Sequence, residues 1–439
     1  MIYISYFIID HLTCLLSLNF LIILDQMYIF KKNQIINLVL ASIIPFLIWG
    51  SFFPDLIVSV SALFFLYYSL NNNNFYYFKK KPFIIFLLFC IIASVISLES
   101  KDISLSIKSS LPYFRIGVFS CFIWYLIDRD KNILTYFYYA LVLCFSALVI
   151  DGYIQYFTGF NVLGFKISGI RVSSFFEEEL IMGSYLSRLF PLLFALFLVK
   201  KKQKYEIYFI GLLFILVDVL IFMSGERSSF FFLNLSTIFI IILIKEYQKF
   251  RLITFIIAII CVFILSLNSS SLSNRMFKGP AEQMGFIESS NEPVIFSEQH
   301  DNHIRTAYKM FKDYPIFGHG PKMFRIICKD EKYATGKYPC STHPHNFYVQ
   351  LLAETGIIGF LFLLSAFSHV IYIALRQFKS IILRQKRPLT DYQVCLLAGI
   401  LITVWPFSPN GNFFHNWLMI VYSLPVGFYL QSIYSRKKV

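Results

Sequence analysis

The sequence predicts an all-α polytopic membrane protein with about 12–13 transmembrane helices and one large, partly helical loop outside the membrane. The 439-residue chain is 57% hydrophobic and only 15% charged, so it has more apolar surface than a soluble protein of this length can bury. Several apolar runs exceed the roughly 18 residues that indicate a membrane helix. These runs also lack the polar–apolar alternation of a transmembrane β-barrel.

The hydrophobic spans are separated by short segments that carry most of the basic residues, for example Lys79–Lys81 and Arg376–Arg387. This placement follows the positive-inside rule, so we expect the basic clusters and the C-terminus on the inner side. The formal net charge of +14 then reflects topology rather than nucleic-acid binding. The spans lie near residues 4–24, 35–50, 54–70, 82–98, 113–128, 133–152, 179–199, 205–222, 228–244, 252–268, 347–375, 392–407 and 414–433.

This alternation predicts three parts: an N-terminal bundle over residues 1–268, a large outer loop over 269–346 and C-terminal helices over 347–439. The first span lacks the basic start and small-residue cleavage site of a signal peptide, so we expect a retained helix. In the outer loop, residues 300–314 predict a helix. Its apolar face would consist of Ile304, Ala307, Tyr308 and Phe311.

Two of the eight cysteines, Cys328 and Cys340, lie in the predicted outer loop, and the other six lie in predicted spans. Cysteines within spans behave as small buried hydrophobic residues. An outer loop faces an oxidising compartment, so we expect Cys328 and Cys340 to form a disulfide. Two free thiols are the alternative.

The segment STHPHNF contains two histidines, His343 and His345, on either side of Pro344. Both precede the span 347–375 at the outer boundary of the membrane. A neutral imidazole at this place can accept a proton at physiological pH, so either residue could act as a general base. Alternatively, they are interfacial histidines that only form hydrogen bonds.

Two arginines could bind an anionic ligand on the same side. Arg227 lies between the spans 205–222 and 228–244, where an arginine is costly unless it has a partner. Glu226 is a possible partner, which would make the pair structural. Arg305 lies on the predicted loop helix, and its guanidinium could hold phosphate oxygens or be merely solvated.

Other polar residues carry weaker indications. Glu178 is the middle residue of a run of three glutamates before the span 179–199; the run could act as an acid–base pair, bind a cation or start a helix. Arg171 and Arg188 flank this run, and Arg188 could face a polar cavity. His415 belongs to a polar turn at the rim of the same region. Glu354, inside a span, has no predicted role beyond a polar contact.

Several motifs are absent from the sequence. It contains no GxxxxGK[ST] loop, no HExxH, no Cys/His quartet with zinc spacing and no GxSxG elbow. We therefore expect no cofactor and no metal site. Free energy for a reaction would come from the substrate or an ion gradient.

The stretch HNFYVQLLAETGIIG resembles the signature of the O-antigen ligase superfamily, which includes Wzy-type polymerases and protein O-oligosaccharyltransferases. IRTAYKMFKDYPIFGHGPKMF resembles the outer-loop block of that family, and SGERSSFF resembles its Ser-Gly-x-Arg element. DGYIQYFTGFNVLG and RVSSFFEEELIMGSYLSRLFPL are also similar to family segments. The resemblance extends over about residues 150–360.

The resemblance implies a metal-independent, inverting glycosyltransferase of the bacterial inner membrane, with its site facing the periplasm. Its donor would be a glycan on undecaprenyl diphosphate. By the same resemblance His345 is the catalytic base, and Arg227 and Arg305 bind the diphosphate. The remaining candidates are secondary: His343, Arg171, Arg188, His303 and Glu178.

The resemblance leaves the acceptor open. It could be lipid A–core, a growing glycan or a protein hydroxyl. We expect lipid A–core, with a growing glycan as the next alternative; a protein acceptor is less favoured because no pilin-recognition element or C-terminal soluble extension is evident. A transporter of lipid-linked sugars is a different class, but the chain lacks the paired halves typical of one. The chain departs from the family pattern in its ten spans before the loop, where nine are usual, and in the EEEL run.

Overall fold

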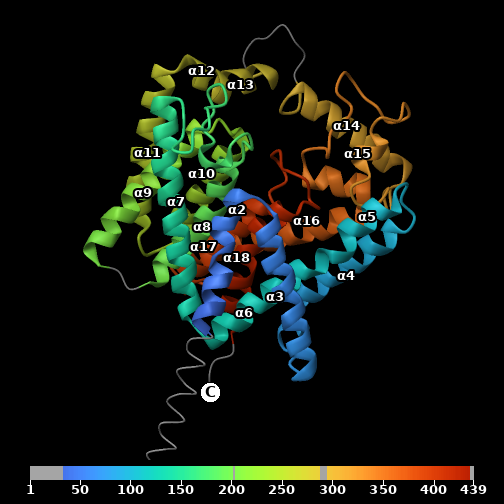
Figure 1. Ribbon diagram of the computed structural model, residues 1–439, viewed down its shortest axis with the longest axis horizontal. Helices are drawn as coiled ribbons and strands as arrows, with labels where there is room; N and C mark the ends of the chain where they lie inside the picture. The colour runs from blue at the N-terminus through green and yellow to red at the C-terminus, as the bar shows by residue number, and fades with distance from the viewer. Residues whose placement is uncertain (1–32, 201–202, 287–293, 436–439) are drawn as a thin grey trace, which may run out of the picture.

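The structure is a computed structural model, and it describes residues 33–200, 203–286 and 294–435. Within these ranges the chain is helical, and the β-type pairings are two isolated bridges. Long helices pack into a bundle, and the short helices α12–α15 lie at one end of it (Figure 1). The predicted all-α membrane architecture is confirmed.

Eight helices of the described chain are long and apolar enough to cross a membrane, and four shorter apolar helices accompany them. They correspond to the predicted spans from 35–50 onward, whereas the predicted span 4–24 lies outside the described residues. The bounds are Asn33–Trp49 (whose second part is α2, Ile43–Trp49), α3 (Phe52–Asn71), α4 (Lys81–Ser97), α5 (Ile103–Ser110), α6 (Phe114–Arg129), α7 (Asn132–Thr158), α8 (Met182–Val199), α9 (Lys204–Met223), α10 (Arg227–Leu243), α11 (Gln248–Asn268), α16 (Phe347–Ile382), α17 (Asp391–Thr403) and α18 (Asn416–Tyr434).

The outer loop contains the helices α12 (Ser270–Ser273), α13 (Gly279–Gln283), α14 (Glu298–Asp313) and α15 (Phe324–Ile327). The helix predicted over 300–314 is α14, but its buried face differs from the predicted one. His303, Ala307 and Met310 are buried, whereas Tyr308 is half exposed. The face thus includes a polar residue that a search for apolar periodicity passes over.

The outer loop is fastened to α16 at a break in that helix. Gly356 has φ +62°, and the next amide, of Ile357, donates to the Pro315 carbonyl at 2.9 Å. The Glu354 carbonyl accepts from the Gly320 amide at 2.8 Å, and the Glu354 carboxylate accepts from the Phe324 amide at 3.1 Å. Glu354 therefore has a structural role, because it holds the turn before α15 against α16.

Gly356→Ala is expected to destabilise this junction by about 2–5 kcal/mol. A Cβ at Gly356 would lie 2.2 Å from the Ile316 carbonyl oxygen, and alanine also disfavours a positive φ. Gly169 also has a φ of +62°, with nothing within 4 Å of a Cβ, so Gly169→Ala is a control without the close contact and should cost about 1–2 kcal/mol. Thermal unfolding in detergent measures both. Equal losses in the two variants would show that the close approach is unimportant.

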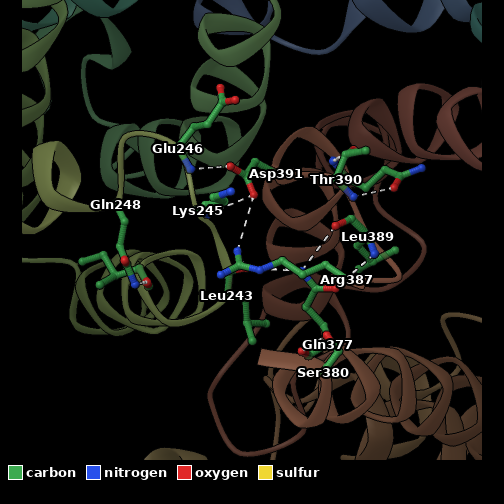
Figure 2. A network of polar contacts seen from close by, with 12 residues as sticks. Leu243, Lys245, Glu246, Gln248, Gln377, Ser380, Arg387, Leu389, Thr390 and Asp391 are labelled. Carbon is green, nitrogen blue, oxygen red and sulfur yellow. Dashed lines mark hydrogen bonds and ion pairs between the residues drawn. The ribbon is translucent and has the colours of Figure 1, made fainter. Parts of the chain in front are cut away.

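The opposite ends of the helices are joined by the polar network in Figure 2. The Asp391 carboxylate accepts from the backbone amides of Lys245 and Glu246 at 3.0 and 2.6 Å. The Gln377 side chain donates to the Leu243 carbonyl at 3.3 Å. These bonds satisfy backbone groups at helix ends and tie the α10–α11 turn to the α16–α17 turn, among the basic residues we expect on the inner side.

An ion pair lies inside the bundle. Arg251 of α11 donates to both carboxylate oxygens of Asp218 of α9, at 3.2 and 2.8 Å. The same guanidinium also donates to Thr237 at 2.8 Å and Thr254 at 3.2 Å. Neither charged residue is appreciably exposed. Arg251 therefore connects α9, α10 and α11 through buried polar contacts.

Candidate active site

One cavity of about 1200 Å³ is lined by segments far apart in the sequence. It is bounded by α8 and the loop before it, the α9–α10 turn, the outer loop and the α17–α18 connection. Among the described residues, five arginines and two glutamates line it, so positive charge prevails and favours an anionic ligand. The charged and imidazole side chains are Arg171, Arg188, Arg227, Arg275, Arg325, Glu179, Glu226, His300, His343, His345 and His415.

A buried polar scaffold shapes the loop that presents Arg171. The Asp151 carboxylate, on α7, accepts from the Ser174 hydroxyl at 2.5 Å. One turn further along α7, the Gln155 side-chain oxygen accepts from the amides of Ser173 and Ser174 at 2.9 and 2.8 Å. The loop between α7 and α8 is thereby tied to α7 just after Arg171, which explains why polar residues lie within an apolar helix.

Three arginines gather around the α9–α10 turn. Arg171 Nε donates to the Ser224 carbonyl at 3.0 Å, and Arg275 Nε donates to the Gly225 carbonyl at 2.9 Å. Arg227 Nε donates in turn to the Arg275 carbonyl at 2.8 Å. Gly225 has φ +65°, and a Cβ there would lie 2.9 Å from Arg275 Nε. The turn therefore requires glycine and holds three guanidinium groups together.

Glu226 is not the partner of Arg227. Its carboxylate accepts from the amides of Gly183 and Ser184 at 2.6 and 2.9 Å, and from the Ser229 hydroxyl at 2.8 Å. These amides belong to the first turn of α8, so Glu226 satisfies an otherwise uncapped helix end. Burial raises the pKa of Glu226 to about 7. In the described chain no carboxylate lies within 4.0 Å of the Arg227 guanidinium.

The His345 ring contacts the rings of three other histidines. Its ring centroid is 4.2 Å from that of His343, 5.0 Å from that of His300 and 5.3 Å from that of His303. Burial, followed by the neighbouring imidazoles, lowers the pKa of His345 to about 2. The ring is therefore neutral at physiological pH, which is the form that accepts a proton.

The backbone around His345 is held in an unusual conformation. Its φ is +59°, which is rare outside glycine and persists only where neighbours enforce it. The Asn410 amide donates to the His345 carbonyl at 2.7 Å. Asn346 caps α16 through the amides of Tyr348 and Val349 at 3.0 and 3.2 Å. The His-Asn pair is thus locked between α16 and the α17–α18 connection.

Arg188 braces this connection from within the bundle. It is 3% exposed, and its Nη2 donates to the Asn410 side-chain oxygen at 2.9 Å. Its guanidinium carbon lies 3.9 Å from the Phe232 ring centroid and 4.4 Å from that of Tyr422. Its other terminal nitrogen donates to the Ile402 carbonyl. Arg188 therefore fixes Asn410 and adds a buried positive charge beside the cavity.

Part of the sequence that forms this site matches a known protein family. Residues 210–364 match the family model described as O-antigen ligase. Over this segment the chain is similar to the O-antigen ligase superfamily. The matched segment contains Arg227, His345 and the whole outer loop, whereas Arg171, Arg188 and the α17–α18 connection lie beyond it. No curated protein sequence matches the chain.

This match supports a ligase- or polymerase-type enzyme of the membrane. Of the residues predicted for this O-antigen ligase-like site, His345, His343, Arg227, Arg171 and Arg188 line the cavity. His303, which is buried, stacks on His345 at an interplanar angle of 25°. The predicted disulfide between Cys328 and Cys340 is present.

Two predicted residues lie elsewhere. Arg305 does not line the cavity: its side chain is 63% exposed, and its Nε lies 2.6 Å from Asp301 of the same helix. It occupies the face of α14 opposite His303, because residues two apart point in nearly opposite directions on a helix. Glu178 is exposed and also lies outside the lining, which instead contains its neighbour Glu179.

Three lining residues were not predicted from the sequence: His300, Arg275 and Arg325. His300 precedes His303 by about one helical turn, and this spacing on α14 was the available signal. Arg275 lies in the π-helical turn Asn274–Lys278, and Arg325 in the four-residue α15; neither has a sequence signal. No group of three or more His, Cys, Asp or Glu side chains in the described ranges could hold a metal ion.

Proposed function

We propose that the chain is an inverting, metal-independent glycosyltransferase that moves a glycan from an undecaprenyl-diphosphate donor to an acceptor hydroxyl. The observation that carries this proposal is the cavity in which a neutral, half-buried His345 lies among arginines without carboxylate partners. We further propose that the protein resides in the bacterial inner membrane, with residues 269–346 and the cavity on the periplasmic side.

In this reaction the diphosphate binds beside the α9–α10 turn. Arg227, Arg171 and Arg275 provide guanidinium groups whose charge stabilises the leaving diphosphate. The acceptor hydroxyl oxygen attacks the anomeric carbon opposite the departing phosphate oxygen, and His345 takes the hydroxyl proton. The new glycosidic bond forms as the bond to phosphate breaks, so the anomeric configuration inverts. Energy comes from the activated glycosyl phosphate.

Arg305, expected to bind the diphosphate, has a different place in this proposal. Its position outside the cavity lining and its bond to Asp301 favour a surface role on α14, while the three arginines at the turn supply the charge. His300, 5.0 Å from His345, lies on the cavity side of the same helix. Substitution of Arg227 tests whether the donor diphosphate binds at the α9–α10 turn.

Arg227→Lys is expected to lower transfer roughly 10- to 100-fold, because an ammonium keeps the charge but loses the planar fork that matches a phosphate. Initial rates at varied donor concentration measure the effect, which should fall mainly on the donor. Arg305→Lys, at an exposed site, is the matched comparison and should have little effect. A greater loss in Arg305→Lys than in Arg227→Lys would reassign the diphosphate to α14.

The acceptor that we propose is lipid A–core, which makes the reaction O-antigen ligation. The purified protein is incubated with a diphosphate-linked glycan and either lipid A–core or a second diphosphate-linked glycan. Ligation extends the first acceptor, and polymerisation lengthens the second. Transfer in detergent with a chelator present supports a metal-independent enzyme; a requirement for added divalent metal, or no transfer without a membrane gradient, would refute the proposal.

A further inference from the structure

The cavity has arginines at both ends of a row of histidines. At one end, burial, His303 and Arg227 lower the pKa of His300 to about 4. His300 and His343 each contact the His345 ring, at centroid distances of 5.0 and 4.2 Å. At the other end, burial lowers the pKa of His343, and the nearby Arg325 contributes to the shift. The base thus lies between two separate positive regions.

Arg325 is held firmly at its end of the row. It belongs to α15, whose first amide, of Phe324, donates to Glu354 at 3.1 Å. The helix is followed directly by Cys328, which is disulfide-bonded to Cys340. This short helix is therefore fastened on both sides, and the position of the guanidinium beside the cavity is set by covalent and buried contacts rather than by a free loop.

The Arg325 guanidinium has no partner in the described chain. Its Nε is buried without a hydrogen bond, and no carboxylate lies within 4.0 Å of it. Glu354 is close enough to interact electrostatically, but its carboxylate is already bonded to Phe324 and Gln350. Lys322, which is near Arg325, adds a second positive charge. A half-buried guanidinium that lines a cavity and whose Nε is buried without a partner favours binding of an anion.

We propose that Arg325 binds a phosphate group of the acceptor, on the side of His345 opposite the donor diphosphate. The inference rests on the proposed function, since it needs a donor at Arg227 and a base at His345. The physical reason is that the histidine row separates two positive regions, whereas transfer of one glycan releases only one diphosphate. One region is enough to bind that leaving group. The second region then recognises charge on the molecule whose hydroxyl attacks.

Two acceptors carry such a phosphate. Lipid A–core has phosphate monoesters, and a diphosphate-linked glycan has its own diphosphate. The test therefore uses four acceptors with the purified protein and one labelled donor: lipid A–core with and without its phosphates, and an acceptor glycan linked to lipid diphosphate or to a neutral lipid. The acceptor pair that loses activity on removal of phosphate identifies the source of the anion.

Removing the acceptor phosphate is expected to raise the acceptor KM of the wild-type protein roughly 10- to 100-fold. Arg325→Gln should raise the KM of the phosphorylated acceptor by a similar factor, and leave that of the dephosphorylated acceptor and of the donor nearly unchanged. This non-additivity is the signature of direct contact. Lys329→Gln, an exposed neighbour, is the matched control and should behave as wild type.

Wild-type transfer that is equally efficient to both members of each acceptor pair would overturn the inference and leave the proposed function intact. An Arg325→Gln variant whose donor KM rises while its acceptor KM does not would also overturn it, because Arg325 would then belong to the donor subsite. Absence of transfer to all four acceptors by the wild-type protein would instead reject the proposed function itself, and the inference with it.

Discussion

His345→Ala is expected to lower glycan transfer by about 10²- to 10⁴-fold, the usual contribution of a general base. The alanine variant keeps the backbone carbonyl that accepts from the Asn410 amide, so the α17–α18 connection should stay in place. The loss should therefore fall on kcat while donor binding at the arginines is preserved. Initial-rate measurements with the purified variant, beside a thermal melting curve, separate the chemical effect from unfolding.

His343→Ala is the matched comparison, since His343 contacts the same ring but has no assigned proton transfer; we expect a smaller loss. A general base acts when deprotonated, and burial keeps the pKa of His345 far below its ordinary value. Protonation of His345 should thus not reduce kcat/KM as the pH falls from about 8 to about 6. Transfer by His345→Ala at the wild-type rate would remove the residue from the mechanism.

The membrane helices could be predicted well because the information is local. A run of apolar residues long enough to cross a bilayer can be recognised as a membrane helix without reference to the rest of the chain. The basic residues between such runs predict on which side of the membrane each helix end lies. The helix predicted at 82–98, for example, is α4 (Lys81–Ser97). The disulfide could be predicted for a similar reason, since only two cysteines lie in the outer loop.

The outer-loop helix shows where local information fails. Apolar periodicity placed Tyr308 on its buried face, but the structure buries His303, whose ring stacks on His345 some forty residues later. A polar side chain that packs on another polar side chain leaves no hydrophobic pattern. Arg305 was expected at the site from the family resemblance, whereas the structure places His300 of the same helix in the cavity lining.

The remaining arginines of the cavity illustrate a second limit. Arg171 and Arg188 stood out because charge near a membrane span is costly. Arg275 and Arg325 lie in a polar loop with other charges, where nothing in the sequence distinguishes a cavity-lining arginine from a solvated one. Their positions depend on Gly225, which lets Arg275 approach the turn, and on the disulfide beside α15. These are tertiary contacts that only the folded chain reveals.

Asp218→Asn is expected to destabilise the bundle by about 3–5 kcal/mol, because it leaves the Arg251 guanidinium buried without a counter-charge. Both side chains are shielded from solvent, so water cannot replace the lost carboxylate. Chemical or thermal unfolding in detergent measures the change. Asp55→Asn is the matched control: its pair with Arg115 is less shielded from solvent than the Asp218–Arg251 pair, so we expect a smaller loss.

The double variant Asp218→Leu/Arg251→Met distinguishes a structural role of the buried ion pair from a role in ion transport. A buried ion pair replaced by apolar residues of similar size is often neutral or stabilising, so the double variant should recover most of the stability that Asp218→Asn loses. It should also transfer glycan normally, because the pair does not line the cavity. Recovered stability without transfer would contradict a purely structural pair and support an ion pathway through the bundle, as a transporter would require. Intact transfer would leave the arginines and histidines of the cavity as the groups that act on substrate.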